Sequence, residues 1–424
     1  QVPRERSSRG AALRGKERLA GLAEMRKQRL LALIKPDDLK AHVRLKMLAV
    51  CAGLHQLADV RLDVICESLF DELTEDSQPR FALIERCNLT GVLWELIERQ
   101  YGYVTDQPSV KDFSIELFKS CYALSMINPQ VQDKPSLNSD ALVLFKRWKD
   151  SRKHGSVFEV LSNDYSALLD IESDLNTRDF RDVIEMDYYR LIDKKVIADL
   201  VSAVEQRTLS EGEITKYCRE RRQGHWHGEF KHLYTAIEVA GQFLNQLDTV
   251  QLHMTSSSDA VHGYVRHWFK IDQLYRKFIY ALKKSGQMTL LNSLFDTIES
   301  LYTNRFLGPL ATQWQGQVDI MDNWSVPDVT QQRQFYDRWV KPYTNQGKKI
   351  CVIISDAFRY EAGVEMTSRI NSENKYQASL EHLLSALPSY TQLGMASLLP
   401  SDGSDFAISE KDATVSIGGI STQG

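Results

Sequence analysis

The sequence predicts a mainly α-helical protein, in which one or more multi-helix domains precede the first strands and helices of an α/β domain. Three observations support this fold class. Apolar and aromatic residues recur at steps of three and four from about residue 31 to 342, which is the spacing of one helix face. A run of β-forming residues, Lys349–Ile354, then interrupts the helical pattern. Strand and helix patterns alternate after it, as they do in an α/β fold.

The composition is that of a globular protein with several domains. A chain of 424 residues is too long for one compact core, so we expect two or three domains. The net charge of −4 argues against a surface that binds nucleic acid over its whole extent. No apolar run reaches the length of a membrane span and no signal peptide is visible, so we expect a cytoplasmic protein that does not cross a membrane.

The six cysteines form no C-x-x-C motif and no close pair. This spacing indicates neither a disulfide framework nor a thiolate zinc site. We interpret most of them as small buried apolar side chains in a reducing compartment. The chain begins with Gln1 rather than Met, and it ends soon after the alternation of strands and helices begins. We therefore expect it to be an excerpt of a larger protein.

Residues 1–30 form a basic N-terminal arm. They contain nine Lys or Arg against three Glu, a net charge of +6, which predicts either an arm for nucleic acid or a solvated terminal helix. A helical domain over 31–205 and a second helical sub-bundle over 206–342 follow. One helix face of the sub-bundle carries Tyr264, Trp268, Ile271, Tyr275, Phe278 and Leu282. Aromatic residues at this spacing are typical of a helical core.

Residues 343–424 begin the α/β domain. Lys349–Ile354 is predicted as a strand buried on both faces of a parallel sheet. We expect a helix over 359–371, a strand over 377–384, a helix over 391–399 and a third strand over 413–417.

Two residues of this region have the chemistry of a phosphoryl-transfer site. Asp356 follows the first strand, at the sheet edge where α/β folds bind ligands, and a carboxylate there is a natural metal ligand. It could instead cap the following helix. Thr391 opens the next helix, and its hydroxyl would need a base or a metal to act as a nucleophile. It could also be a helix N-cap, with Ser389 as a competing cap.

The segments Ile353–Glu361 and Leu387–Pro400 resemble the PglZ family of BREX bacteriophage-exclusion systems. Leu96–Tyr103, Gln107–Asp112 and Gly419–Gly424 are similar to it as well. The resemblance implies an alkaline-phosphatase-like domain, in which Asp356 binds metal and Thr391 is both nucleophile and metal ligand. It also implies two divalent metal ions, zinc by expectation. The implied partners are other BREX proteins, namely a methyltransferase and accessory subunits, together with DNA.

The sequence departs from the superfamily pattern in its metal ligands. An Asp-His pair is expected near a later strand, but the chain has no such dipeptide. The aspartates after Thr391 are Asp402, Asp405 and Asp412. His382 precedes the nucleophile. A two-metal site therefore does not close within these residues, and we expect the excerpt to be inactive and to bind no metal.

Three other groups of residues have a notable spacing or charge. His225, His227, Glu229 and His232 have a loose metal-like spacing, but we favour packing and surface roles. Arg266, Lys270, Arg276, Lys277, Lys283 and Lys284 crowd one helix, which indicates a solvated face or a contact for DNA or an acidic partner. Arg359 and Glu361 follow Asp356 closely. They could orient the metal ligand or contact substrate phosphate, or they could lie on the helix surface.

Two hypotheses follow for the function. The first is a metal-dependent phosphatase or phosphodiesterase of phage defence that uses Thr391 as its nucleophile. The second is a non-catalytic helical scaffold that docks other defence proteins or DNA, because the helical region is larger than a phosphatase needs.

Overall fold

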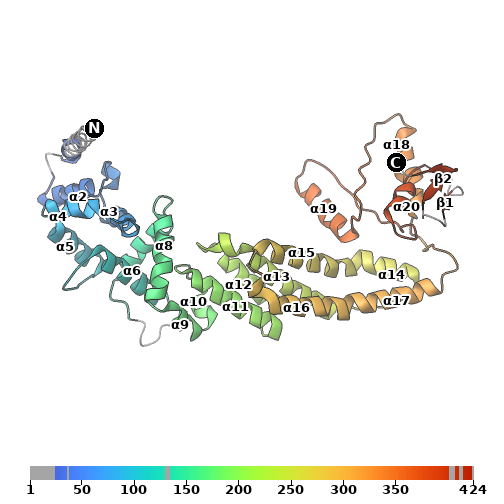
Figure 1. Ribbon diagram of the computed structural model, residues 1–424, viewed down its shortest axis with the longest axis horizontal. Coiled ribbons are helices and arrows are strands. Elements are labelled where there is room, and N and C mark those ends of the chain that lie inside the picture. The colour runs from blue at the N-terminus through green and yellow to red at the C-terminus, as the bar shows by residue number, and fades with distance from the viewer. Residues whose placement is uncertain (1–23, 36–37, 129–133, 401–405, 410–413, 423–424) are drawn as a thin grey trace, which may run out of the picture. The chain divides into compact units, whose positions relative to one another are not determined.

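The protein, seen here as a computed structural model, is described over residues 24–35, 38–128, 134–400, 406–409 and 414–422. The chain divides into two compact units, residues 1–199 with 219–231 and residues 200–218 with 232–424. Both are built mainly from helices, as predicted (Figure 1). The predicted domain boundaries after residues 30, 205 and 342 stay predictions. Residues 1–23 of the predicted basic arm lie outside the described residues. Its remaining residues belong to a helix over 24–33.

The first unit packs short helices around a cluster of aromatic rings. Its elements are α2 Lys40–Cys51, η1 Leu57–Asp59, α3 Leu62–Phe70, η2 Asp71–Thr74, α4 Pro79–Arg86, α5 Thr90–Tyr101, α6 Val110–Leu124, α7 Ser139–Lys149, α8 Gly155–Leu168, α9 Ile171–Asn176 and α10 Phe180–Val183. The buried ring of Phe118 lies at the centre, 4.7 Å from Phe145, 5.1 Å from Phe158 and 5.4 Å from Tyr165 between ring centroids. Offset and edge contacts of this kind add to the stability that burial supplies.

Three longer helices contain the points at which the two units divide. They are α11 Arg190–Gln206, α12 Glu211–Arg221 and α13 His227–Thr249. The start of α12 is fixed by reciprocal hydrogen bonds, in which the Ser210 amide donates to Glu213 and the Glu213 amide donates to the Ser210 hydroxyl. This is a capping box, which satisfies two amides that the helix itself leaves without partners.

The second unit continues as a helical bundle. Its helical elements are α14 Ser257–Gly263, η3 Tyr264–Trp268, α15 Phe269–Ser285, η4 Met288–Leu291, α16 Asn292–Leu301, η5 Tyr302–Leu307, α17 Gly308–Asp319, η6 Gln332–Gln334, η7 Tyr336–Val340, α18 Lys341–Thr344, α19 Tyr360–Ser372 and α20 Thr391–Ala396. Figure 1 shows α14 and α15 lying alongside α16 and α17. The predicted aromatic stripe lies in this core: Ile271 and Phe278 are fully buried and Trp268 nearly so.

The region after residue 343 differs from the predicted parallel sheet. Lys349–Ile354 has no regular secondary structure and pairs with no strand in the described part of the chain, and Ile353 is 88% exposed rather than buried. An apolar run becomes a buried strand only when neighbouring strands take up its amides and carbonyls. The predicted strand over 377–384 is likewise reduced to one parallel bridge, between Leu384 and Gln331.

The strands that do form are antiparallel. They are β1 Phe406–Ile408, β2 Val415–Ile417 and β3 Ile420–Ser421, in the order β1-β2-β3. Thus β2 forms where the third strand was predicted, but in another kind of sheet. Both predicted helices are present: α19 begins one residue later than expected, and α20 begins at Thr391 as expected but ends at Ala396.

None of the six cysteines, all of which lie in the described residues, is part of a disulfide, and four of them are buried. In the described residues, no helix combines the length and the apolar character that a membrane span requires.

Candidate functional site

Asp356 follows the apolar run Lys349–Ile354 and stands at a strained turn. The next residue, Ala357, has a φ of 54°, a conformation that costs energy for any residue with a Cβ and that often occurs at functional sites. The Ala357 amide donates to Asp356 Oδ1 at 3.0 Å. The N-cap of α19 is Arg359, without a side-chain hydrogen bond. Asp356 therefore does not cap that helix, and the capping alternative is wrong.

Thr391 is the first residue of α20, and its side chain faces Asp356. The Thr391 hydroxyl donates to Asp356 Oδ2 at 3.2 Å across 35 positions of sequence. The N-cap of α20 is Tyr390, again without a side-chain hydrogen bond. Neither Ser389 nor Thr391 is thus the N-cap of α20. The side chains of Asp356 and Thr391 both belong to exposed residues. The two residues singled out for chemistry lie together, with their polar atoms directed at one another.

The carboxylate and the hydroxyl supply two oxygen donors, the ligand type that hard and borderline cations accept. Within the described residues, no group of three or more His, Cys, Asp or Glu side chains is placed to hold a metal ion. A catalytic zinc takes three protein ligands, so the described residues do not by themselves fit a zinc centre. Asp402, Asp405 and Asp412, the later carboxylates predicted as candidates, lie outside the described residues.

Arg359 lies three residues after Asp356, in the wall of a cavity of about 510 Å³. Its side chain forms no hydrogen bond or ion pair with the described residues, and its positive charge opposes the rise in the pKa of Tyr302 that burial causes. The guanidinium therefore lies near that ring. Its predicted role, contact with a substrate phosphate, stays a prediction.

The helix that follows Asp356 is fixed to α15 by ion pairs. The Arg276 Nε donates to both carboxylate oxygens of Glu361, at 2.7 and 2.9 Å, and its Nη2 donates to Glu365 at 2.6 Å. Gln273 donates to the Glu361 carbonyl at 3.0 Å. The acidic partner of this basic helix is thus, in part, α19 of the same chain. Sequence reasoning missed this pairing, although Glu361 and Glu365 stand one helical turn apart.

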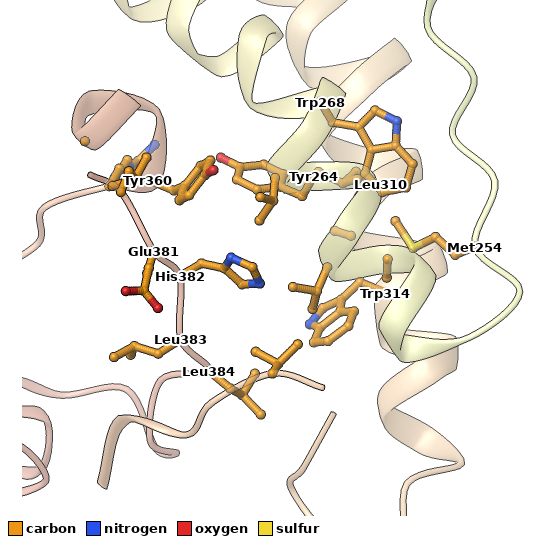
Figure 2. Close-up of a pocket in the computed structure, with 18 of the residues that line it drawn as sticks. Met254, Tyr264, Trp268, Leu310, Trp314, Tyr360, Glu381, His382, Leu383 and Leu384 are labelled. Carbon is orange, nitrogen blue, oxygen red and sulfur yellow. The ribbon is translucent and has the colours of Figure 1, made fainter. Parts of the chain in front are cut away.

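Figure 2 shows the cavity beside this site, between the segment of Glu381 and the helices of Tyr264 and Trp314. The His382 ring points into it. Burial lowers the pKa of His382 below its ordinary value, and the neighbouring His262 lowers it further. The imidazole is therefore neutral at pH 7. His382 was predicted to precede the nucleophile in a strand, and it lies in the segment with the single bridge instead.

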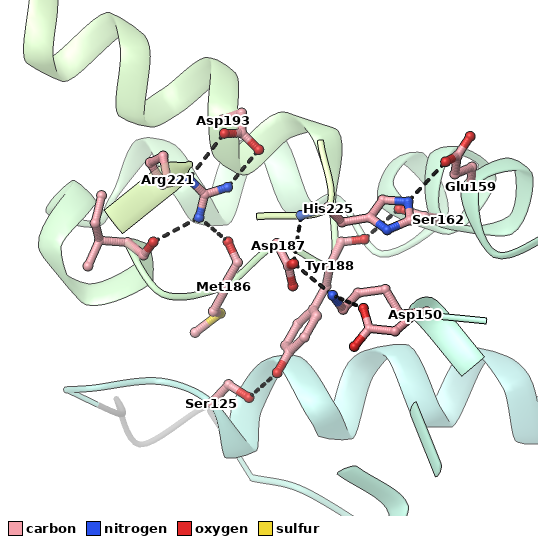
Figure 3. A network of polar contacts seen from close by, with 12 residues as sticks. Ser125, Asp150, Glu159, Ser162, Met186, Asp187, Tyr188, Asp193, Arg221 and His225 are labelled. Carbon is pink, nitrogen blue, oxygen red and sulfur yellow. Dashed lines mark hydrogen bonds and ion pairs between the residues drawn. The ribbon is translucent and has the colours of Figure 1, made fainter. Parts of the chain in front are cut away.

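The histidines at 225–232 do not converge. α13 begins at His227, so His225 lies outside the helix on which a shared face was considered. Figure 3 shows His225 beside Glu159, to which its Nε2 is 3.0 Å distant. Glu229 is paired with Arg190. Both contacts lie within the first unit.

The region of Asp356 and Thr391 is similar to a known protein family. Residues 335–424 match the family model described as the BREX system PglZ alkaline phosphatase-like domain. The chain is 31% identical to the alkaline phosphatase-like protein BrxZ of Escherichia coli, over 96% of this chain and 50% of that protein. It is 26% identical to the alkaline phosphatase-like protein PglZ of Bacillus cereus, over 83% of this chain and 42% of that protein. The chain thus spans half or less of these relatives. No solved structure matches it significantly.

Proposed function

Because the chain belongs to the PglZ and BrxZ alkaline phosphatase-like family of BREX systems, we propose that it contributes Thr391 and Asp356 to a phosphatase or phosphodiesterase site of bacteriophage defence. In this proposal Thr391 is the nucleophile, and both residues are ligands of a divalent metal, zinc by expectation. The remaining ligands are not among the described residues, so no step is assigned to the metal. The proposed partners are other BREX proteins.

The observation that carries the proposal is the 3.2 Å hydrogen bond from Thr391 to Asp356. It fixes the hydroxyl next to a carboxylate that can orient it and accept its proton. In the proposed reaction, a bond forms between Thr391 Oγ1 and phosphorus while the bond from phosphorus to the ester oxygen breaks. The alcohol leaves with a proton, and water then hydrolyses the phosphothreonine.

The test uses the full-length natural protein that contains this chain. Thr391→Ala should reduce hydrolysis of p-nitrophenyl phosphate or its bis-p-nitrophenyl diester by roughly 10³-fold or more, because no other group replaces a covalent nucleophile. Thr391→Ser keeps a hydroxyl and should retain part of the rate. Ser389→Ala is the matched control, since it removes a hydroxyl two residues away. A phosphopeptide containing Thr391, trapped by acid quenching, would identify the intermediate. Hydrolysis that survives Thr391→Ala unchanged would rule the mechanism out.

A scaffold that docks defence proteins or DNA is the second candidate. The observation in its favour is the set of exposed cations on η3 and α15, Arg266, Lys270, Lys283 and Lys284, which form no ion pair with described residues. Such a face suits an anionic partner. If Thr391→Ala leaves phage resistance and complex assembly intact while charge reversal of Lys283 and Lys284 abolishes them, the scaffold is the function.

A further inference from the structure

The cavity beside the Asp356 turn has the size and lining of a ligand site. Its volume of about 510 Å³ falls within the range of roughly 300–1,000 Å³ that small-molecule sites occupy. Aromatic rings from four separate elements line it: Tyr264 and Trp268 of η3, Trp314 of α17, Phe358 of the turn and Tyr360 of α19. Figure 2 shows Tyr264 and Tyr360 facing one another across its upper part, with their ring centroids 6.4 Å apart. Walls of this kind favour a planar aromatic ligand.

The polar side chains of this largely apolar lining include Arg359, Glu381 and His382. His382 points into the cavity (Figure 2) and forms no hydrogen bond with the described residues, while the rings nearest to it are Tyr360 and His262. A neutral imidazole offers one donor and one acceptor. A half-buried polar group without a partner favours a ligand that supplies one. The ring that fits best therefore carries a hydrogen-bonding edge.

The cavity adjoins the proposed reaction site. Phe358 in its wall is two residues from Asp356, so their Cα atoms are at most about 7.6 Å apart. Arg359, the next wall residue, has a guanidinium without an ion pair in the described structure. A phosphate at Thr391 could thus carry a ring that enters the cavity. The distance from phosphate to ring in an aryl or nucleoside ester is of this order.

We propose that this cavity is a specificity subsite for the phosphate ester on which Thr391 acts, and that it takes a planar aromatic group with a hydrogen-bonding edge. The subsite rests on the proposed function for its connection to catalysis. Trp314 and Tyr360 contact the faces of the ring, His382 contacts its edge, and Arg359 faces the phosphate.

The binding experiment does not depend on hydrolysis, because it uses the full-length natural protein with Thr391→Ala. Isothermal titration with three probes separates the contributions: inorganic phosphate, phenyl phosphate and thymidine 5′-monophosphate. Phenyl phosphate should bind more tightly than inorganic phosphate, and thymidine 5′-monophosphate should bind more tightly than phenyl phosphate. From inorganic phosphate to the thymidine probe, the affinity should rise by about 10-fold. Trp314→Ala should remove most of this gain. His382→Phe keeps a ring but loses the polar edge, so it should remove the advantage of the thymidine probe over phenyl phosphate.

Trp94→Ala, which removes an indole from the first unit, is the matched control and should leave all three affinities unchanged. Equal affinity for the three probes, or a preference that survives both Trp314→Ala and His382→Phe, overturns the proposal. The proposal is also overturned if the 424-residue chain binds the aromatic probes but the full-length protein does not. Another segment of the full-length protein would then fill the cavity. If the ring preference holds while Thr391→Ala hydrolyses esters as fast as the natural protein, the subsite stands and the proposed nucleophile fails.

Discussion

Arg276 on α15 donates two hydrogen bonds to Glu361 on α19, and the Glu361 residue is 1% exposed. A carboxylate buried to this degree is tolerated only with a charged and hydrogen-bonded partner. Glu361 lies five residues after Asp356, so this ion pair holds the start of the helix that follows the proposed metal ligand. Within the second unit, the helical bundle therefore contributes directly to the position of the candidate site.

Arg276→Met should destabilise the second unit, because it leaves the Glu361 carboxylate buried without its cation. Losing one partner of a fully buried pair costs about 3–5 kcal/mol. The Arg276 side chain is 41% exposed, so screening reduces the expected loss to about 1–3 kcal/mol. Urea unfolding measures it. Arg338→Met is the control, since the pair of Arg338 with Glu381 is half exposed on both sides and should contribute about 1 kcal/mol or less. Equal losses in the two variants would contradict the prediction.

Glu365, the second partner of Arg276, makes the same contact dependent on pH. Burial alone would raise the pKa of Glu365, but the hydrogen bond from Arg276 and the charge of Lys277 outweigh it, so the pKa lies below its ordinary value of 4.5. A carboxylate whose pKa is lower in the folded state stabilises the protein above the unfolded pKa. This stabilisation is lost as the pH falls through the folded value.

The measurement is the urea midpoint of the natural chain and of Glu365→Gln between pH 7 and pH 3. The natural chain should be the more stable above about pH 4.5, and the difference should shrink steadily below it. A difference that stays constant over this range would show that the carboxylate charge contributes nothing.

Asp193 and Arg221 form the corresponding buried pair of the first unit (Figure 3). Arg221 donates to both Asp193 oxygens, at 3.1 and 2.6 Å, and to the Ile184 carbonyl at 2.8 Å. Both side chains are almost fully buried. Asp193→Ala should therefore cost about 3–5 kcal/mol of unfolding free energy. Glu159→Ala removes the exposed partner of His225 and should cost about 1 kcal/mol or less. Similar values for the two would refute the role assigned to burial.

The sequence predicted the helices and the two residues of the candidate site, because their signals are local. A period of three and four residues marks a helix face wherever that helix packs, and α19 and α20 begin within one residue of the expected positions. The chemistry of Asp356 and Thr391 and the family resemblance both predicted a shared site, but the hydrogen bond between them is a contact across 35 residues that no spacing encodes.

The absence of the predicted strand at Lys349–Ile354 could not be foreseen in the same way. Its apolar residues favour a buried strand, but pairing depends on neighbours elsewhere in the chain. In the described residues no strand pairs with it, so Ile353 is exposed. The contact of Arg276 with Glu361 was missed for a related reason. A basic helix has the same composition whether its cations face solvent or a helix 85 residues away.

Gly263 is required by the packing of Trp268 in the wall of the cavity. A Cβ atom at this position would lie 2.5 Å from Cη2 of Trp268. The Trp268 indole is also held by its hydrogen bond to the Gln251 carbonyl. Alanine gains about 1 kcal/mol over glycine in a helix, but overpacking costs about 1–3 kcal/mol. Gly263→Ala should therefore be destabilising on balance and should shift the fluorescence of the displaced indole.

Gly316→Ala tests the opposite case, because this helical glycine has open space around it. The substitution should stabilise the protein by about 0.5–1 kcal/mol. Stabilisation by both substitutions would show that Trp268 moves aside freely.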